Sequence, residues 1–157
     1  MDESRLNDIE IARSYYEYTT TEYLINDIVS KCKIGQISRL PYPQNPVWND
    51  EMESKYIESI LLRMPIIPIV ACLWKEERQL ETIDGSQRIQ ALVDYCLGKL
   101  KLCGLEILKS LNGTIISDLP ALEKDKFLAR CIKFHLMGSK GQDIHADIYF
   151  RYNAIQD

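Results

Sequence analysis

An apolar stripe that follows a glycine turn limits the fold of this chain more than any other feature of its sequence. The stripe has the spacing of residues on one face of a helix, i, i+3, i+4, i+7 and i+8, and consists of Ile89, Leu92, Val93, Cys96 and Leu97. Gly98 follows directly, and a glycine is the commonest residue just past a helix end. The sequence therefore predicts a helix that begins at Ser86 and ends at Leu97.

Further helices and strands are predicted on both sides of this helix. Apolar residues at helical spacing predict helices at 20–33, 50–64, 121–128 and 145–153. Runs of β-branched or alternating apolar residues predict strands at 66–74, 79–83, 99–108 and 131–137. The first two strands are separated by a charged turn, which predicts a hairpin. Helices interleaved with strands predict an α+β fold, in which helices pack on a mixed sheet.

The segment 36–50 is predicted to be an extended loop. It contains Pro41, Pro43 and Pro46, and each proline fixes its own φ angle and lacks a backbone donor. A strand in the centre of a sheet needs those donors, so this segment is excluded from such a position.

The length and composition of the chain predict one soluble domain. It has 157 residues, of which 46% are hydrophobic, enough to bury a core but too few for two ordinary domains. Residues 1–20 are polar and are predicted to form an N-terminal arm, and residues 21–157 a single domain. No apolar run approaches the roughly 20 residues that a membrane helix needs, and the start is acidic, unlike a signal peptide. We therefore expect a cytoplasmic protein with no membrane partner.

Charge and metal-ligand content restrict the chemistry that this chain can carry. The formal net charge is −4, so the field of the whole chain repels phosphate weakly and any anion site must be local. The five cysteines are scattered and never form a C-x-x-C pair, which disfavours zinc and a disulfide framework. The chain has only two histidines, His135 and His145. No metal site built from protein ligands is predicted.

The segment Asp84-Gly85-Ser86-Gln87-Arg88 joins a predicted strand to the strongest predicted helix. The first N–H groups of a helix lack intrahelical partners and point outward, so a phosphate placed there receives several donors. Gly85 permits close approach, Ser86 adds a hydroxyl, and Arg88 offers a two-pronged contact to phosphate oxygens. The Asp84 carboxylate repels phosphate unless a cation lies between them. It would hold Mg²⁺ indirectly, orient a water, or cap the helix.

A structural interpretation of the same segment stays open. Aspartate, glycine and serine are ordinary turn residues at a junction between a strand and a helix. Short glycine motifs of this kind match often by chance, so a second signal is needed.

The second signal is an ordered set of motifs across most of the chain. The motifs are Pro43 with Val47 and Trp48, residues 55–62, 65–69, 83–92, 111–113 with 118–120, and 149–153. In this order they resemble the N-terminal domain of GmrSD-type modification-dependent restriction enzymes. That family has a ParB/sulfiredoxin-like fold whose hallmark is a D-G-Q-Q-R box.

The resemblance implies a nucleotide-handling module. In that family the box binds and helps to hydrolyse a nucleoside triphosphate, and a second domain cuts modified DNA. The candidate catalytic residues are Asp84, Gln87 and Arg88, with Gln87 as a water-orienting or phosphate-contacting amide and Arg88 as the charge stabiliser. Ser86 replaces the first glutamine of the box and has a shorter reach. The implied ligand is a nucleoside triphosphate with Mg²⁺.

The sequence also departs from the family and its relatives. The family usually has Q-R before the V-W pair, whereas Gln44 is here followed by Asn45, whose neutral amide cannot supply the charge of an arginine. Sulfiredoxin-like relatives have a cysteine where Ser86 stands, so sulfinic-acid reduction is disfavoured. ParB-like relatives carry paired arginines and bind CTP and DNA, whereas here Gln87 precedes Arg88.

Several further residues are nucleotide-binding candidates. Together with the turn, the set is Gln44, Trp48, Glu58, Gly85, Ser86, Arg151 and Asn153. Trp48 either stacks on a base or covers the core. Glu58 either lines the pocket or lies on the surface, where it would pair with Lys55 or Arg63. Arg151 and Asn153 are about 200° apart on a helix, so both face one pocket only if the helix ends between them, and Arg151 is the expected functional residue.

These observations predict a nucleoside-triphosphate-binding module of a DNA restriction or anti-restriction system, with hydrolysis left open. The alternative is a non-catalytic binding module or regulator that engages a partner nuclease or DNA. No H-N-H-type nuclease segment is recognised in the sequence. The acidic net charge predicts that the chain alone binds duplex DNA weakly and without sequence preference.

Overall fold

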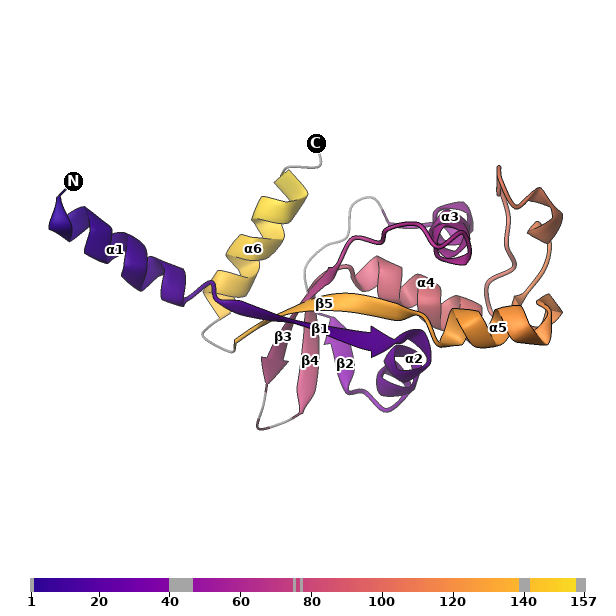
Figure 1. Cartoon of the computed structure of the whole chain (residues 1–157), viewed down its shortest axis with the longest axis horizontal. Helices are drawn as coiled ribbons and strands as arrows, with labels where there is room; N and C mark the ends of the chain where they lie inside the picture. The colour runs from indigo at the N-terminus through magenta and orange to yellow at the C-terminus, as the bar shows by residue number, and fades with distance from the viewer. Residues whose placement is uncertain (1, 40–46, 75, 77, 139–141, 155–157) are drawn as a thin grey trace.

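A five-stranded mixed sheet organises the chain in a computed structural model, which describes residues 2–39, 47–74, 76, 78–138 and 142–154 (Figure 1). The strand order is β1-β5-β3-β4-β2, from β1 (Tyr18–Leu24), β5 (Cys131–Met137), β3 (Ile69–Trp74) and β4 (Gln79–Asp84) to β2 (Ile37–Arg39). The β1–β5 and β3–β4 pairs are antiparallel, and the β3–β5 and β2–β4 pairs are parallel. The predicted α+β fold is thus confirmed.

Helices cover both faces of the sheet, so alternate strand residues enter two separate cores. On β3, Ile69 and Ala71 join the larger core, whereas Val70 and Cys72 join the smaller one. The larger core is closed by α2 (Ile25–Lys33), α3 (Asp50–Leu61), α4 (Ser86–Cys96) and α5 (Ala121–Leu128). The smaller core is closed by α6 (Gln142–Ala154). This arrangement brings the C-terminal helix to the edge of the Gly85 turn.

The predicted hairpin and the predicted helix after it are both confirmed. Strands β3 and β4 pair with Trp74 opposite Gln79. Gly85 has a φ of 106° and turns the chain from β4 into α4, whose buried residues include Ile89 and Leu92. Asn49 caps the preceding helix α3, because its side-chain oxygen accepts the Met52 N–H at 3.0 Å.

The predicted helix at 20–33 is wrong in its first part. Residues Tyr18–Leu24 form the edge strand β1, and the helix starts only at Ile25. The run of three threonines before Glu22 favours extended structure, and β5 offers an unpaired edge along its whole length. Tertiary pairing therefore overrides the helical spacing of the apolar residues.

The predicted strand at 99–108 is also wrong. Residues 99–120 form an irregular loop that contains two short 3₁₀ turns, Lys109–Leu111 and Ile116–Asp118. Leu100 and Leu102 are buried as the alternation suggested, but Gly104 has a φ of 67° and breaks the extended path. The loop is held instead by hydrogen bonds such as that from Leu102 N–H to the Thr114 carbonyl, at 2.9 Å.

Helix α1 (Glu3–Ser14) lies outside both cores. It has no buried residue and extends away from the sheet (Figure 1). Its end is tied to α6 by Tyr16, whose hydroxyl donates to the Asp147 carboxylate at 2.9 Å. The β1 strand begins at Tyr18, inside the segment 1–20 that was predicted as an arm. None of the helices in the described part of the chain has the length and apolar character needed to cross a membrane.

A pair of carboxyl groups, one buried and one half-buried, joins α3 to α4. Glu53 is buried, and its side chain is hydrogen-bonded to that of Asp94. Desolvation, the negative charge of Asp94 and this hydrogen bond raise the pKa of Glu53 from 4.5 to about 7. The folded protein therefore favours the neutral form of Glu53 below about pH 7.

This carboxyl pair predicts a loss of stability as the pH rises. A carboxyl group with a raised pKa in the folded state stabilises the fold below its unfolded pKa, and that contribution disappears as the pH passes through about 7. We expect the free energy of unfolding, measured by urea denaturation, to fall by about 1 to 3 kcal/mol between pH 5 and pH 8. Glu53→Gln should flatten this dependence, whereas Glu123→Gln, at an exposed acid on α5, should leave it unchanged. Equal slopes for wild type and Glu53→Gln would contradict the assignment.

Candidate functional site

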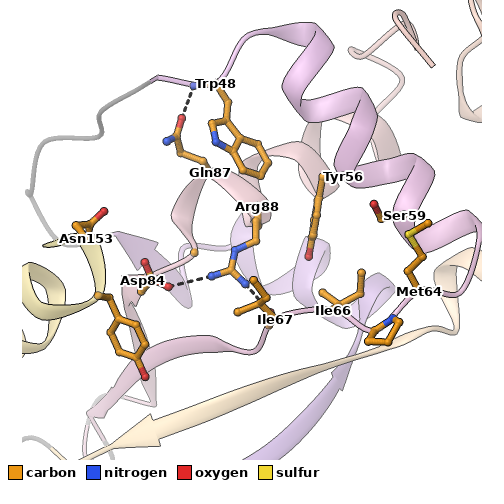
Figure 2. Close-up of a pocket in the computed structure, with 13 residues that line it drawn as sticks. Trp48, Tyr56, Ser59, Met64, Ile66, Ile67, Asp84, Gln87, Arg88 and Asn153 are labelled. Atoms are coloured by element: carbon orange, nitrogen blue, oxygen red, sulfur yellow. Dashed lines mark hydrogen bonds and ion pairs between the residues drawn. The ribbon is translucent and has the colours of Figure 1, made fainter. Parts of the chain in front are cut away.

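A cavity of about 410 Å³ opens where the N-terminus of α4 meets α3 and the end of α6 (Figure 2). Two of its walls come from α3 and from the chain that leads into β3. The residues that line it are Trp48, Tyr56, Ser59, Met64, Pro65, Ile66, Ile67, Asp84, Gly85, Gln87, Arg88, Tyr152 and Asn153. The sequence-predicted residues Trp48, Asp84, Gly85, Gln87, Arg88 and Asn153 are thus brought together.

Gly85 is required at the turn for two reasons. Its φ of 106° is unfavourable for any residue with a side chain. A Cβ atom there would lie 3.0 Å from Arg88 Nη2 and 3.0 Å from Ile69 Cγ1, closer than ordinary contacts allow. Because Gly85 has no side chain, the guanidinium of Arg88 can fold back and pack closely over the turn.

Arg88 is held by a set of acceptors that belong to the fold. Its Nη2 lies 3.0 Å from Asp84 Oδ2, and the two side chains are only 13% and 15% exposed. Its Nη1 donates to the carbonyl oxygens of Ile67, at 2.5 Å, and Pro68, at 3.3 Å. The guanidinium thus ties the end of β4 and the start of α4 to the chain that leads into β3, and Asp84 neutralises its charge.

Gln87 connects α4 to the segment before α3. Its Oε1 accepts a hydrogen bond from the Trp48 backbone N–H (Figure 2). The Trp48 ring meets the Tyr56 ring edge to face, with 5.9 Å between the ring centres. Trp48 also packs on the larger core, which is one of its two predicted roles, and it lines the cavity; stacking on a base stays a prediction.

The last turn of α6 supplies the far wall of the cavity. Tyr152 and Asn153 line it, and the Asn153 side-chain amide donates to the Tyr149 carbonyl at 2.7 Å. Arg151 does not line this cavity, contrary to its predicted role. The helix continues to Ala154, so a residue two positions before Asn153 faces another direction. Arg151 is exposed and pairs with Asp147 at 2.9 Å.

Two other candidate residues lie away from the cavity. Glu58 is buried on another side of α3, where its Oε2 accepts the backbone N–H groups of Ile107, at 3.2 Å, and Leu108, at 2.9 Å. It therefore holds the irregular loop rather than a ligand. Ser86 is also buried, and it borders a different hollow with Thr82 and Ile89. Gln44, with its neighbour Asn45, lies outside the described residues.

Sequence reasoning missed seven residues that line the cavity. Three of them have side chains that can form hydrogen bonds, Tyr56, Ser59 and Tyr152, and the other four are Met64, Pro65, Ile66 and Ile67. Tyr56 lies within the segment 50–64, whose apolar residues predict a helix, and no separate role is predicted for it. The residue is only 9% exposed. Ser59 and Tyr152 lie within the quoted motifs, but nothing about their type distinguishes them from surface residues.

The charged side chains of the cavity are one acid, Asp84, and one arginine, Arg88, which are paired with each other. Among the lining residues that the structure describes, Asp84 is the only acidic one and Arg88 the only basic one. Within the described residues, no group of three or more His, Cys, Asp or Glu side chains comes together to hold a metal ion. Mg²⁺ commonly binds through one or two protein carboxylates together with phosphate oxygens and water, and Asp84 offers one such carboxylate.

Comparisons of the chain with protein families, curated proteins and solved structures find no match.

The geometry of the Gly85 turn predicts a specific sensitivity to a methyl group. Gly85→Ala should be strained by its φ and by contacts with Arg88 and Ile69, whereas Gly113→Ala should be strained by its φ of 83° alone, because nothing lies within 4 Å of its Cβ position. The left-handed strain is about 1 to 2 kcal/mol in each variant, and overpacking adds about 1 to 3 kcal/mol at Gly85. Thermal and urea unfolding of the two variants should show the larger loss at Gly85. Equal losses would contradict the close packing of Arg88 over the turn.

Proposed function

We propose that this chain binds a nucleoside triphosphate in the cavity beside the Gly85 turn, as a module of a DNA restriction or anti-restriction system. One observation carries the proposal. The motifs that resemble the restriction-enzyme family lie far apart in the sequence, yet all of them except the segment 111–120 contribute residues to the same cavity. If these motifs served only to build the hydrophobic core, their residues would not need to surround a cavity.

The chemistry of the cavity suits such a ligand. A volume of about 410 Å³ is within the usual range of small-molecule sites, which is about 300 to 1,000 Å³. The N-terminus of the eleven-residue helix α4 opens at one end, where its dipole favours a phosphate group. Trp48 and Tyr152 offer ring surfaces to a base, a contact worth about 1 to 3 kcal/mol where it has been measured.

The Asp84 carboxylate makes binding depend on a divalent cation. A triphosphate placed at the turn without a cation meets the negative charge of Asp84, while the positive charge of Arg88 is already neutralised at 3.0 Å. Mg²⁺ arriving with the triphosphate would supply positive charge between the two anions. Asp84 is the residue that would hold it on the protein side, and the phosphate oxygens and water would complete its coordination.

A second candidate function, a binding module or regulator without catalysis, is favoured by the state of two of the three candidate catalytic side chains, Gln87 and Arg88. The Gln87 amide oxygen is engaged by Trp48, and the Arg88 guanidinium is engaged by Asp84 and two carbonyl groups. In this arrangement the Gln87 side chain is held against the backbone of Trp48, and one of the two acceptor positions of its oxygen is already occupied. Binding is therefore supported more directly than hydrolysis, and such a module would act by engaging a partner nuclease or DNA.

The proposed role of Asp84 predicts opposite effects with and without metal. Asp84→Asn removes a negative charge and frees the Arg88 guanidinium, so it should strengthen binding of a metal-free triphosphate. It should weaken binding of the same triphosphate with Mg²⁺. Both dissociation constants are measured by titration calorimetry. We expect the constant without metal divided by the constant with Mg²⁺ to be about tenfold smaller in Asp84→Asn than in wild type, equivalent to roughly 1.4 kcal/mol.

A matched control for this experiment is present on α6. Asp147 and Arg151 form an acid–arginine pair with the same sequence spacing as Asp84 and Arg88, but outside the cavity. Asp147→Asn should leave the metal dependence unchanged. Failure of the wild-type chain to bind any of the four common triphosphates with Mg²⁺ would overturn the proposed function. An unchanged metal dependence in Asp84→Asn would overturn only the role of Asp84.

A single-turnover hydrolysis experiment distinguishes a binding module without catalysis from a nucleotide hydrolase. Because Gln87 and Arg88 are engaged, we expect the wild-type chain alone to release phosphate from a bound triphosphate no faster than the Gln87→Ala variant does. Phosphate release can be followed with excess protein over labelled nucleotide. A wild-type rate at least tenfold above that of Gln87→Ala would show that Gln87 is released during turnover and that the chain is a nucleotide hydrolase.

A further inference from the structure

The hydroxyl group of Tyr56 has no hydrogen-bond partner among the described residues. The oxygen is buried, and the whole residue is only 9% exposed. A buried polar group that lacks a partner costs about 1 to 3 kcal/mol relative to one that is satisfied. Such groups are rare in folded proteins and require an explanation, which is often a function of the site.

The position of Tyr56 points to the cavity as the source of a partner. Tyr56 lies on α3 and lines the cavity together with Arg88, Ile66 and Ile67. In Figure 2 its ring descends from α3, and the hydroxyl end is directed toward the segment that contains Ile66. The Tyr56 ring also makes an edge-to-face contact with the Trp48 ring. The oxygen itself is covered, so a ligand in the cavity would contact it after the side chains that cover it move aside.

The electrostatic surroundings decide what kind of partner fits. Burial raises the pKa of Tyr56 to about 12, while the positive charges of Arg88 and Arg130 act in the opposite direction. The hydroxyl thus stays protonated at neutral pH and can donate. Arg88 is paired with Asp84, but a cation held by Asp84 would leave the charges of both arginines to favour an anionic acceptor over a neutral one. Arg130 itself is fixed, since it donates to the carbonyl groups of Ile60 and Met64.

We infer that the Tyr56 hydroxyl donates a hydrogen bond to a phosphate oxygen of the bound ligand and so selects for its phosphate chain. This inference rests on the proposed function, because it places the ligand in the same cavity. It assigns the phosphate chain to the side of the cavity between Tyr56 and the Gly85 turn. The base then lies toward Tyr152 at the other wall.

Tyr95 provides a matched control for this role. Its hydroxyl is also buried without a partner among the residues that the structure describes, and the residue is fully buried. It does not line the cavity, and its ring packs edge to face on Phe127 with 5.3 Å between the ring centres. Removing either hydroxyl should therefore leave the stability of the free protein unchanged or higher, because an unsatisfied buried group is lost. Only the Tyr56 hydroxyl should affect binding.

The experiment compares Tyr56→Phe, Tyr95→Phe and wild type by titration calorimetry. The probes are a nucleoside triphosphate with Mg²⁺ and inorganic tripolyphosphate with Mg²⁺. We expect Tyr56→Phe to weaken binding of both probes about 10- to 100-fold, the usual effect of one hydrogen bond to a charged group. Tyr95→Phe should bind as wild type does. Thermal unfolding without ligand should give melting temperatures at or above that of wild type for both variants.

The outcomes separate this inference from the proposed function. If wild type binds the triphosphate and Tyr56→Phe binds it equally well, the inference is overturned and the proposed function stands. A loss seen with the nucleotide but not with tripolyphosphate overturns the assignment to phosphate, because the hydroxyl then contacts the sugar or base. If wild type binds neither probe, the proposed function fails, and the inference that rests on it fails as well. A lower melting temperature for Tyr56→Phe shows that the hydroxyl is a structural group and also overturns the inference.

Discussion

The ion pair between Asp84 and Arg88 is the interaction on which the candidate site depends. Both residues belong to a single turn, but the guanidinium reaches outside it to the carbonyl groups of Ile67 and Pro68. One side chain therefore fixes the end of β4, the first turn of α4 and the chain that leads into β3. Gly85 makes this possible, because a Cβ atom would occupy the space that the guanidinium needs. The turn that resembles a phosphate-binding turn thus also serves to pack these three segments together.

The cavity exists because three further elements converge on this turn. Gln87 holds the backbone of Trp48 beside α4, and α3 follows directly with Tyr56 on the same wall. Helix α6 packs on the smaller core across the opposite face of the sheet, which places Asn153 at the far wall. Each contact is local in space but spans a long stretch of sequence. The site is therefore a property of the folded sheet, and no single motif could form it alone.

The parts that were predictable from the sequence were those that local patterns determine. The helix after Gly85 was predictable because its buried stripe and its glycine boundaries lie within one short segment. The strand at Tyr18–Leu24 was not, since its conformation depends on pairing with β5, more than a hundred residues later. Glu58 shows the same limit at the level of a side chain. Its position suggested a pocket or surface residue, but its carboxylate is used to hold a loop whose path no local pattern revealed.

The same ion pair also determines how a phosphate ligand and a cation would influence each other under the proposed function. Arg88 cannot turn its full charge toward a phosphate while Asp84 neutralises it at 3.0 Å. A cation on Asp84 would weaken that pairing and make the guanidinium available, and a phosphate on Arg88 would in turn leave Asp84 free to hold the cation. Coupling between two ligands is reciprocal by thermodynamic necessity, so each would raise the affinity for the other by the same factor. In the absence of both, the acid and the arginine satisfy each other, which explains how two charged groups are tolerated in a largely buried turn.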